Sequence, residues 1–151
     1  MIKVLFVCHG NICRSTMAES VFTHMVKERK IENQFEIFSA GTSREEIGNP
    51  VHYGTLNKLK ELSIPVVPHR AVQMTKEDLE HYDYIIAMDD NNIRNIERII
   101  GGKNEKVKKL LSFTGSITDI ADPWYTEDFD KTYEDIKKGL NAFLEKINCI
   151  I

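Results

Sequence analysis

Three residues near the start of the chain have the types and spacing needed for phosphoryl transfer: Cys8, Arg14 and Ser15. Cys8 ends an apolar run, and the arginine follows six residues later, immediately before the serine. A thiolate is a strong nucleophile, and a guanidinium matches the oxygens of a phosphate group. The pattern C-x5-R-S therefore suggests a site that holds an oxyanion above a reactive sulfur.

The residues between the cysteine and the arginine can form a tight loop. Gly10 and Asn11 tolerate positive φ, so the backbone can curl and aim successive N–H groups at one point. A helix starting near Ser15 would add its positive dipole end. The same groups favour the thiolate of a cysteine that would otherwise be mostly protonated at neutral pH. We expect a phosphate-binding loop made of His9, Gly10, Asn11, Ile12, Cys13, Arg14 and Ser15, with Cys8 at its floor.

The elements that would position this loop alternate between strand and helix. The run 2–7 is apolar apart from Lys3, which is typical of a strand buried on both faces. Further strands are predicted at 35–39, 66–67 and 84–88, and the stretch 103–109, KNEKVKK, as a solvated loop or an edge strand. Helices are predicted at 15–29, from Pro50 to before Pro65, after the TKED sequence at 75–78, at 88–100 up to Gly101, and over 129–147.

This alternation predicts an α/β fold: a three-layer, open, mostly parallel four-stranded sheet with helices on both faces. Such sheets bind ligands beyond the carboxyl ends of their strands, often where the strand order reverses. A phosphate-binding loop directly after the first strand fits this rule.

Composition limits the other possibilities. A chain of 151 residues favours a single domain over 1–151, and the net charge of −3 argues against nucleic-acid binding. No apolar run is long enough to span a membrane. Three cysteines (Cys8, Cys13, Cys149) without a secretory signal favour a reducing cytoplasm, and no spacing of histidines and cysteines suggests a metal site.

Five segments together resemble one family along essentially the whole chain. They are the C-x5-R-S loop very near the N-terminus, FSAGT at 38–42, HRAVQMTKEDL at 69–79, YDYIIAMDDNN at 82–92 and ADPWY at 121–125. This set resembles the low-molecular-weight protein tyrosine phosphatases. The separate Asp-Pro element makes the match specific, because several other thiol enzymes also have a cysteine loop.

The resemblance assigns roles to residues that the pattern alone would leave as turn or surface positions. Asp122 matches the general acid, with Asp119 as a weaker alternative, although an Asp-Pro pair is by itself a common turn signal. Asp89 is expected to cap a helix, with Asn91 and Asn92 at the surface. Asn11, Ser39 and His69 match residues that support the loop, and the expected pocket wall is His9, Glu45, Trp124 and Tyr125.

The expected activity is hydrolysis of phosphotyrosine in proteins, and of small aryl phosphates, through a phosphocysteine on Cys8. Arg14 would bind the phosphate, Asp122 would protonate the leaving group, and Ser15 would donate to the sulfur. Activity should be highest at mildly acidic pH, with inorganic phosphate as product and no cofactor. We expect a monomeric cytoplasmic protein whose partners are phosphotyrosine proteins, without nucleic acid or membrane.

Some positions differ from the common family pattern, and some alternatives stay open. Thr16 stands where proline is usual, and His9 where a small or aliphatic residue is common. The segment SREEIGNP at 43–50, which contains Glu45 and Glu46, lacks an aromatic residue that some relatives have. A reversible disulfide between Cys8 and Cys13 is possible. A protein arginine phosphatase is the main alternative, although the apolar Ile12 suits an aromatic ring better. Arsenate reductases would need cysteines at 70–90, and a cysteine phosphocarrier would not need Asp122.

Overall fold

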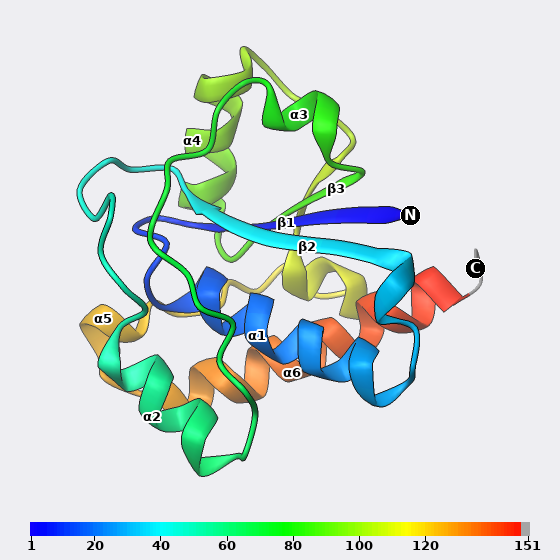
Figure 1. Cartoon of the computed structure of the whole chain (residues 1–151). Helices are drawn as coiled ribbons and strands as arrows, with labels where there is room; N and C mark the ends of the chain where they lie inside the picture. Colours follow the sequence, from blue (N-terminus) through cyan, green and yellow to red (C-terminus); the bar gives the residue numbers. More distant parts are fainter. Residues whose placement is uncertain (149–151) are drawn as a thin grey trace.

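The computed structural model describes residues 1–148, in which short strands alternate with helices (Figure 1). Cys149 lies outside the described residues. The strands are β1 (Ile2–Cys8), β2 (Phe35–Gly41), β3 (Tyr84–Ala87) and β4 (Val107–Lys109). The helices are α1 (Arg14–Glu28), α2 (Tyr53–Glu61), α3 (Asp78–His81), α4 (Asp90–Ile100), α5 (Pro123–Thr126) and α6 (Phe129–Asn148), with 3-10 turns at Glu32–Gln34 and Leu110–Thr114.

The four strands form one parallel sheet in the order β2-β1-β3-β4. β1 is a central strand, paired along its length with β2 and, from Val4 to Val7, with β3. Val4 to Val7 are fully buried, as an apolar run between two covered faces requires. The order of strands reverses at β1, so the loop after Cys8 lies at the switch point of the sheet.

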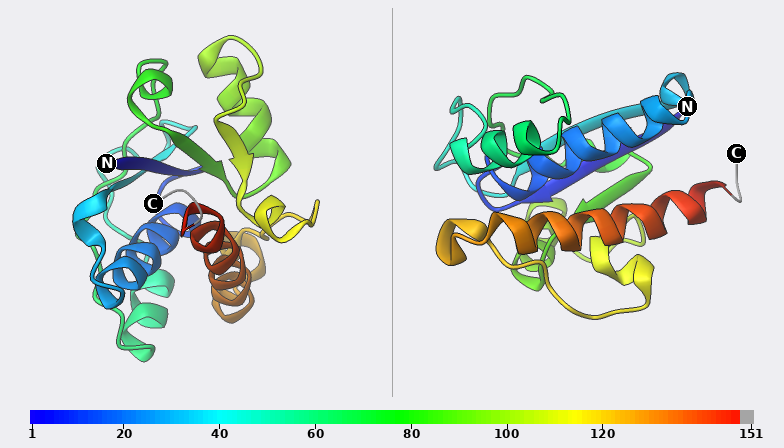
Figure 2. Two further views of the ribbon diagram at one scale, coloured as in Figure 1. Left: turned by 90° about the vertical axis from the view of Figure 1, so that its right-hand side faces the viewer. Right: turned by 90° about the horizontal axis from the view of Figure 1, so that it is seen from below.

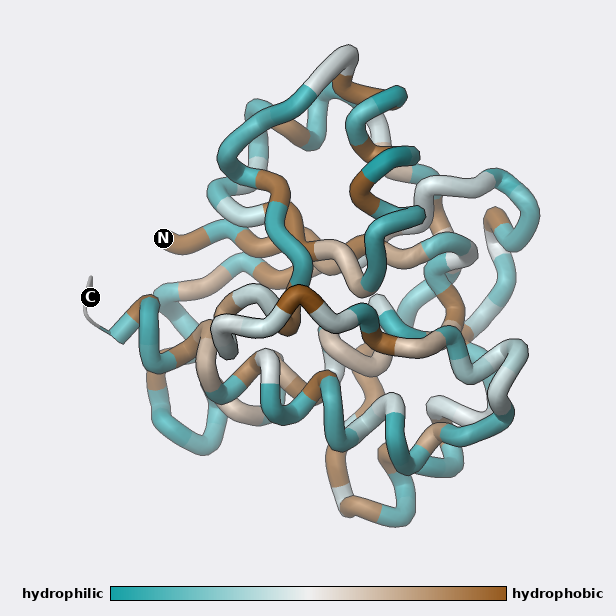
Figure 3. Tube along the Cα trace, turned by 180° about the vertical axis from the view of Figure 1, so that it is seen from behind, coloured by the Kyte–Doolittle hydropathy of each residue, from teal (hydrophilic) through white to brown (hydrophobic). Residues whose placement is uncertain are grey.

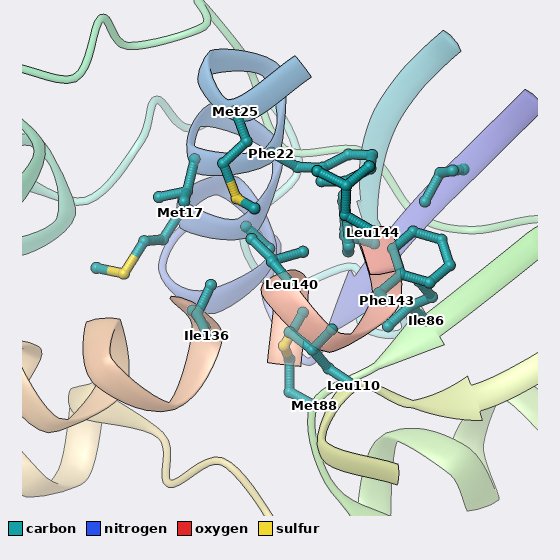
Figure 4. Close-up of a cluster of buried hydrophobic side chains, with 14 of the residues drawn as sticks. Met17, Phe22, Met25, Ile86, Met88, Leu110, Ile136, Leu140, Phe143 and Leu144 are labelled. Atoms are coloured by element: carbon teal, nitrogen blue, oxygen red, sulfur yellow. The ribbon is translucent and has the colours of Figure 1, made fainter. Parts of the chain in front are cut away.

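Helices cover both faces of the sheet, which confirms the predicted three layers (Figures 1 and 2). α1, α2 and α6 lie on one face, and α3 and α4 lie on the other. The larger core fills the first side, where Phe22 of α1 packs against Phe143 of α6 (Figure 4). Phe22 also packs against Phe6 and Phe35 of the sheet. Burying one such side chain contributes about 1.5–3 kcal/mol. In Figure 3 the apolar residues gather around the strands, and polar residues dominate the outer loops.

The predicted strand at 66–67 is wrong, and β4 takes its place in the sheet. Pro65 and Pro68 flank the two valines and have no N–H to give to a ladder, and the N–H of Val67 donates to Ser20 Oγ at 3.0 Å. The basic stretch 103–109 instead supplies the short edge strand, one of the two predicted outcomes. Exposed lysine is typical of such an edge.

Helix boundaries differ from the expectation mainly at α2. Pro50 does not lie in its first turn: the helix begins at Tyr53, where His52 Nδ1 accepts from the N–H of Gly54 at 3.0 Å. α4 ends at Gly101 as predicted, with φ of 87°. The apolar stripe of α6 is buried at Tyr133, Ile136, Leu140, Phe143 and Ile147, as the spacing indicates.

Candidate active site

The predicted phosphate-binding loop connects the end of β1 to the start of α1. Cys8 is 3% exposed at the end of the strand, and Arg14 is the first residue of the helix. Only one of the two expected residues has a left-handed backbone: Asn11 has φ of 60°, whereas Gly10 does not adopt positive φ. The glycine that the loop does require is Gly41 of β2, where a Cβ would lie 2.8 Å from the carbonyl oxygen of His9. The close approach of β2 therefore helps to shape the loop.

The side chain of Asn11 holds this loop through four hydrogen bonds. Its amide donates to Ser15 Oγ at 2.9 Å and to Ser39 Oγ at 3.0 Å. Its carbonyl oxygen accepts from the N–H of Val72 at 3.0 Å and from His69 Nε2 at 2.6 Å. The structure thus brings Asn11, Ser39 and His69 together, as expected from the sequence.

Glu19 also belongs to this network, and the sequence reasoning missed it. Ser39 Oγ donates to Glu19 Oε1 at 2.6 Å, and His69 Nδ1 lies 3.6 Å from the same oxygen. Burial raises the pKa of Glu19 to about 7, against the opposing effect of the Ser39 hydrogen bond. A carboxylate among the buried apolar residues of α1 was the available signal, because such a group needs partners.

Arg14 is held rigidly by three acceptors. Its Nη1 donates to Asp89 Oδ2 at 2.7 Å and to the carbonyl oxygen of Ile120 at 2.9 Å, and its Nη2 lies 3.4 Å from Asp122 Oδ2. Burial disfavours the charged guanidinium, but the neighbouring Cys8 and the Asp89 carboxylate outweigh this and raise the pKa of Arg14. The arginine is therefore a fixed cation beside the sulfur.

Asp89 combines the predicted helix cap with a contact to the arginine. Its Oδ1 accepts from the N–H of Asn92 at 2.7 Å at the start of α4, while its Oδ2 binds Arg14. The prediction that Asn92 is surface-exposed is wrong: it is 1% exposed, and its side-chain oxygen accepts from the N–H groups of Met88 and Asp89. This reciprocal capping orients the carboxylate of Asp89 toward the site.

The serine after the arginine contacts the sulfur. Ser15 Oγ lies 3.0 Å from Cys8 Sγ and accepts a hydrogen bond from Asn11. Because Asn11 donates to this oxygen, the hydroxyl hydrogen of Ser15 is free to point at the sulfur. The arrangement suits a thiolate better than a thiol.

Cys13 and Thr16 complete the loop. Cys8 and Cys13 are both free thiols. Burial, aided by the negative charges of Cys8 and Asp122, raises the pKa of Cys13 to about 12, so this residue stays protonated near neutral pH. Thr16 is buried, and its hydroxyl donates to the carbonyl oxygens of Ile12 at 2.9 Å and Cys13 at 3.0 Å. The threonine thus ties the helix to the loop, where a proline could not donate.

Asp122 lies beside Arg14, although the two residues are far apart in the sequence. It caps α5, where its Oδ1 accepts from the N–H of Trp124 at 3.0 Å and Pro123 occupies the first turn. Its other oxygen lies beside Arg14. The alternative acid, Asp119, is instead paired with Lys109 at 2.8 Å and does not line the pocket. Of the two candidate acids, Asp122 is therefore the one that lines the cavity with Cys8.

A cavity of about 120 Å³ joins these groups. Its lining residues are Cys8, His9, Gly10, Ile12, Cys13, Arg14, Glu45, Glu46, Asp122, Trp124 and Tyr125. Asn11, Ser15, Ser39 and His69 do not line it. Within this group Asn11 hydrogen-bonds to the other three. Trp124 and Tyr125 are 55% and 81% exposed at the mouth of the cavity, where an aromatic substrate ring could lie between side chains.

Residues 1–148 contain no group of three or more histidine, cysteine, aspartate or glutamate side chains placed to hold a metal ion. Over the same residues, no helix has the length and apolar character needed to cross a membrane.

Comparison with known proteins gives a consistent result over nearly the whole chain. The model of the low molecular weight phosphotyrosine protein phosphatase family matches residues 3–149. The chain is 40% identical to the low molecular weight protein-tyrosine-phosphatase YfkJ of Bacillus subtilis, covering 97% of this chain and 96% of that protein. It is 41% identical to the low molecular weight phosphotyrosine protein phosphatase of Gallus gallus, covering 95% and 94%.

Solved structures agree. The crystal structure of YfkJ superposes with a TM-score of 0.94, covering 98% of this chain and 95% of that chain. A Drosophila arginine phosphatase, 28% identical, superposes with a TM-score of 0.87 over 96% and 97% of the two chains.

Proposed function

The chain belongs to the low molecular weight phosphotyrosine protein phosphatase family, and from this premise we propose that it hydrolyses phosphotyrosine in proteins through a phosphocysteine on Cys8. The observation that carries the proposal is the meeting of Cys8, Arg14 and Asp122 at one cavity. A nucleophile, a cation for phosphate oxygens and a proton donor are the three groups that this reaction requires.

In the first step the Cys8 thiolate attacks phosphorus, and an S–P bond forms as the P–O bond to the tyrosine breaks. The Ser15 hydroxyl, 3.0 Å from the sulfur, stabilises the thiolate before attack. Arg14 and the loop N–H groups hold the phosphoryl oxygens, on which charge must be stabilised. Asp122 gives its proton to the leaving phenolate oxygen.

In the second step water attacks the phosphocysteine. Asp122, now a carboxylate, takes a proton from the water as the new P–O bond forms and the S–P bond breaks. The electron pair returns to Cys8, whose thiolate again accepts from Ser15. Inorganic phosphate leaves, and the enzyme is restored without any cofactor.

A protein arginine phosphatase is the second candidate. The likeness to the Drosophila arginine phosphatase and the carboxylates of Glu45 and Glu46 on the pocket wall favour it, because a phosphoarginine carries a guanidinium. Ile12 lines the same pocket and favours an aromatic ring. We therefore propose phosphotyrosine, and not phosphoarginine, as the preferred substrate.

We also propose that residues 1–151 form one phosphatase domain that acts as a monomer in the cytoplasm. Support for the single domain is the family match to residues 3–149 and the one continuous sheet.

The test is phosphate release at mildly acidic pH without added metal, from a phosphotyrosine peptide and a phosphoarginine peptide. Wild type should release phosphate from phosphotyrosine, and Cys8→Ser should release none. Faster release from phosphoarginine would favour the second candidate. Label retained on Cys8 without release would contradict hydrolysis by either route.

A further inference from the structure

The rim of the active-site cavity carries negative charge beyond what the reaction uses. Arg14 and Asp122 contact each other inside the cavity. The remaining charged groups on its lining are the carboxylates of Glu45 and Glu46, with His9 as the titratable neighbour. Arg44 is next to Glu45 in the sequence but does not line the cavity.

These two carboxylates are placed to meet a substrate. The side chain of Glu45 is 73% exposed, and its carboxylate contacts His9 Nε2 at 3.4 Å across the rim. Glu46 packs over the loop, because a Cβ at Gly10 would lie 3.2 Å from its Cγ, and its carboxylate accepts from the side chain of Asn49. Glu46 is therefore held above the loop, while the exposed carboxylate of Glu45, beside His9, can contact an incoming group.

A second groove continues the acidic surface. It has a volume of about 730 Å³, shares Trp124 with the active-site cavity, and runs along α2 beside the start of α6. Its charged lining residues are Glu61, Glu127, Asp130 and a single cation, Lys58. Lys58 is already paired with Glu61 and Asp130, at 2.7 Å each, so the groove retains negative charge.

Exposed aromatic rings lie along the same path. Tyr53 in the groove is 72% exposed, Trp124 lines both the groove and the active-site cavity, and Tyr125 lines the active-site cavity. A guanidinium stacks on such rings and pairs with carboxylates at the same time, which an ammonium does less well.

We propose that the substrates are phosphotyrosine segments with basic residues, arginine above all, directly beside the phosphotyrosine. The flanking arginines contact Glu45 and Glu46 at the rim, and the peptide continues over Trp124 into the groove. This inference rests on the proposed function, and it adds a charge requirement to it.

The experiment uses three phosphotyrosine peptides that differ only in the residues on either side of the phosphotyrosine: arginine, serine or glutamate. We expect kcat/KM to follow the order arginine, serine, glutamate at low salt. Each exposed carboxylate–guanidinium contact should contribute about two- to fivefold. At about 0.3 M salt the differences should shrink, because exposed charges are screened.

Variants test whether the preference for arginine depends on the rim carboxylates. In the double variant Glu45→Gln, Glu46→Gln, which removes both rim carboxylates, the ratio of kcat/KM for the arginine peptide to kcat/KM for the serine peptide should fall toward one. The matched control is Glu105→Gln, the same change at an exposed residue before β4, at the opposite edge of the sheet. The control should keep the wild-type ratio.

The outcomes separate the two proposals. No hydrolysis of the serine peptide would overturn the proposed function itself. Hydrolysis of the serine peptide with equal or slower turnover of the arginine peptide at low salt would overturn the charge requirement alone. A preference for arginine that survives unchanged in the double variant would also overturn it.

Discussion

Replacing Asn11 by alanine should show how strongly a single amide holds the active-site loop. The side chain is 1% exposed and makes four hydrogen bonds, to Ser15, Ser39, His69 and the backbone of Val72. A hydrogen bond contributes about 0.5–1.5 kcal/mol net, so four contribute about 2–6 kcal/mol if they add. An alanine at φ of 60° should cost about 1 kcal/mol more.

We therefore expect Asn11→Ala to lower the free energy of unfolding by at least about 2 kcal/mol. Turnover should fall about a hundredfold, because the loop N–H groups and Ser15 lose their positions. Urea unfolding followed by circular dichroism gives the first quantity, and steady-state turnover of p-nitrophenyl phosphate, well below the unfolding midpoint, gives the second.

The matched control is Asn33→Ala, an exposed asparagine in the 3-10 turn before β2. It should change stability by less than about 0.5 kcal/mol and leave turnover unchanged. The reasoning is refuted if Asn11→Ala loses less than about 1 kcal/mol and keeps wild-type turnover, since the loop would then hold its shape without the amide.

Three further predictions concern the proton donor, the second thiol and the core. Asp122→Asn should slow turnover of phenyl phosphate about 10²–10⁴-fold and p-nitrophenyl phosphate less, because the better leaving group needs less protonation; equal losses would contradict the role. Because the folded state keeps the Cys13 proton from its ordinary pKa of 9.0 up to about 12, the free energy of unfolding should fall as pH rises through this range. In urea unfolding, Cys13→Ala should lack this pH-dependent loss of stability. If the free energy of unfolding of the variant falls with pH as steeply as that of wild type, the prediction is wrong. Gly139→Ala would place a Cβ 2.5 Å from Leu110 Cγ and should lower stability by about 1–3 kcal/mol, despite better helix propensity; a urea midpoint at or above wild type would exclude this clash.

The elements with a strong local pattern could be predicted from the sequence. The apolar run of β1 and the stripe of α6 each bury the residues that their periodicity indicates. The short strands could not be assigned in this way, because their pairing depends on distant partners. Val66 and Val67, which lie between two prolines, are outside the sheet. The lysine-rich segment 103–109 instead supplies β4, which pairs with β3.

In the active site, too, features formed by contiguous residues could be predicted, and features formed by distant segments could not. The loop from Cys8 to Ser15 is contiguous, so its chemistry could be inferred from spacing. The role expected for Asp122 depended on family resemblance, because an Asp-Pro turn is common. The place of Glu19 in the network and the contact between Asp89 and Arg14 became visible only in the structure, because segments far apart in the sequence form them.

The central position of β1 has a consequence for synthesis on the ribosome. β1 emerges first, but both of its neighbours come later, from residues 35–41 and then 84–87. Until they appear, this strand, apolar apart from Lys3, has two unpaired edges, which makes the nascent chain prone to association. Asp122, which caps α5, is translated after all four strands, so the proposed nucleophile is made long before the proposed proton donor. A ribosome-bound chain should therefore stay inactive until nearly the whole protein has been made.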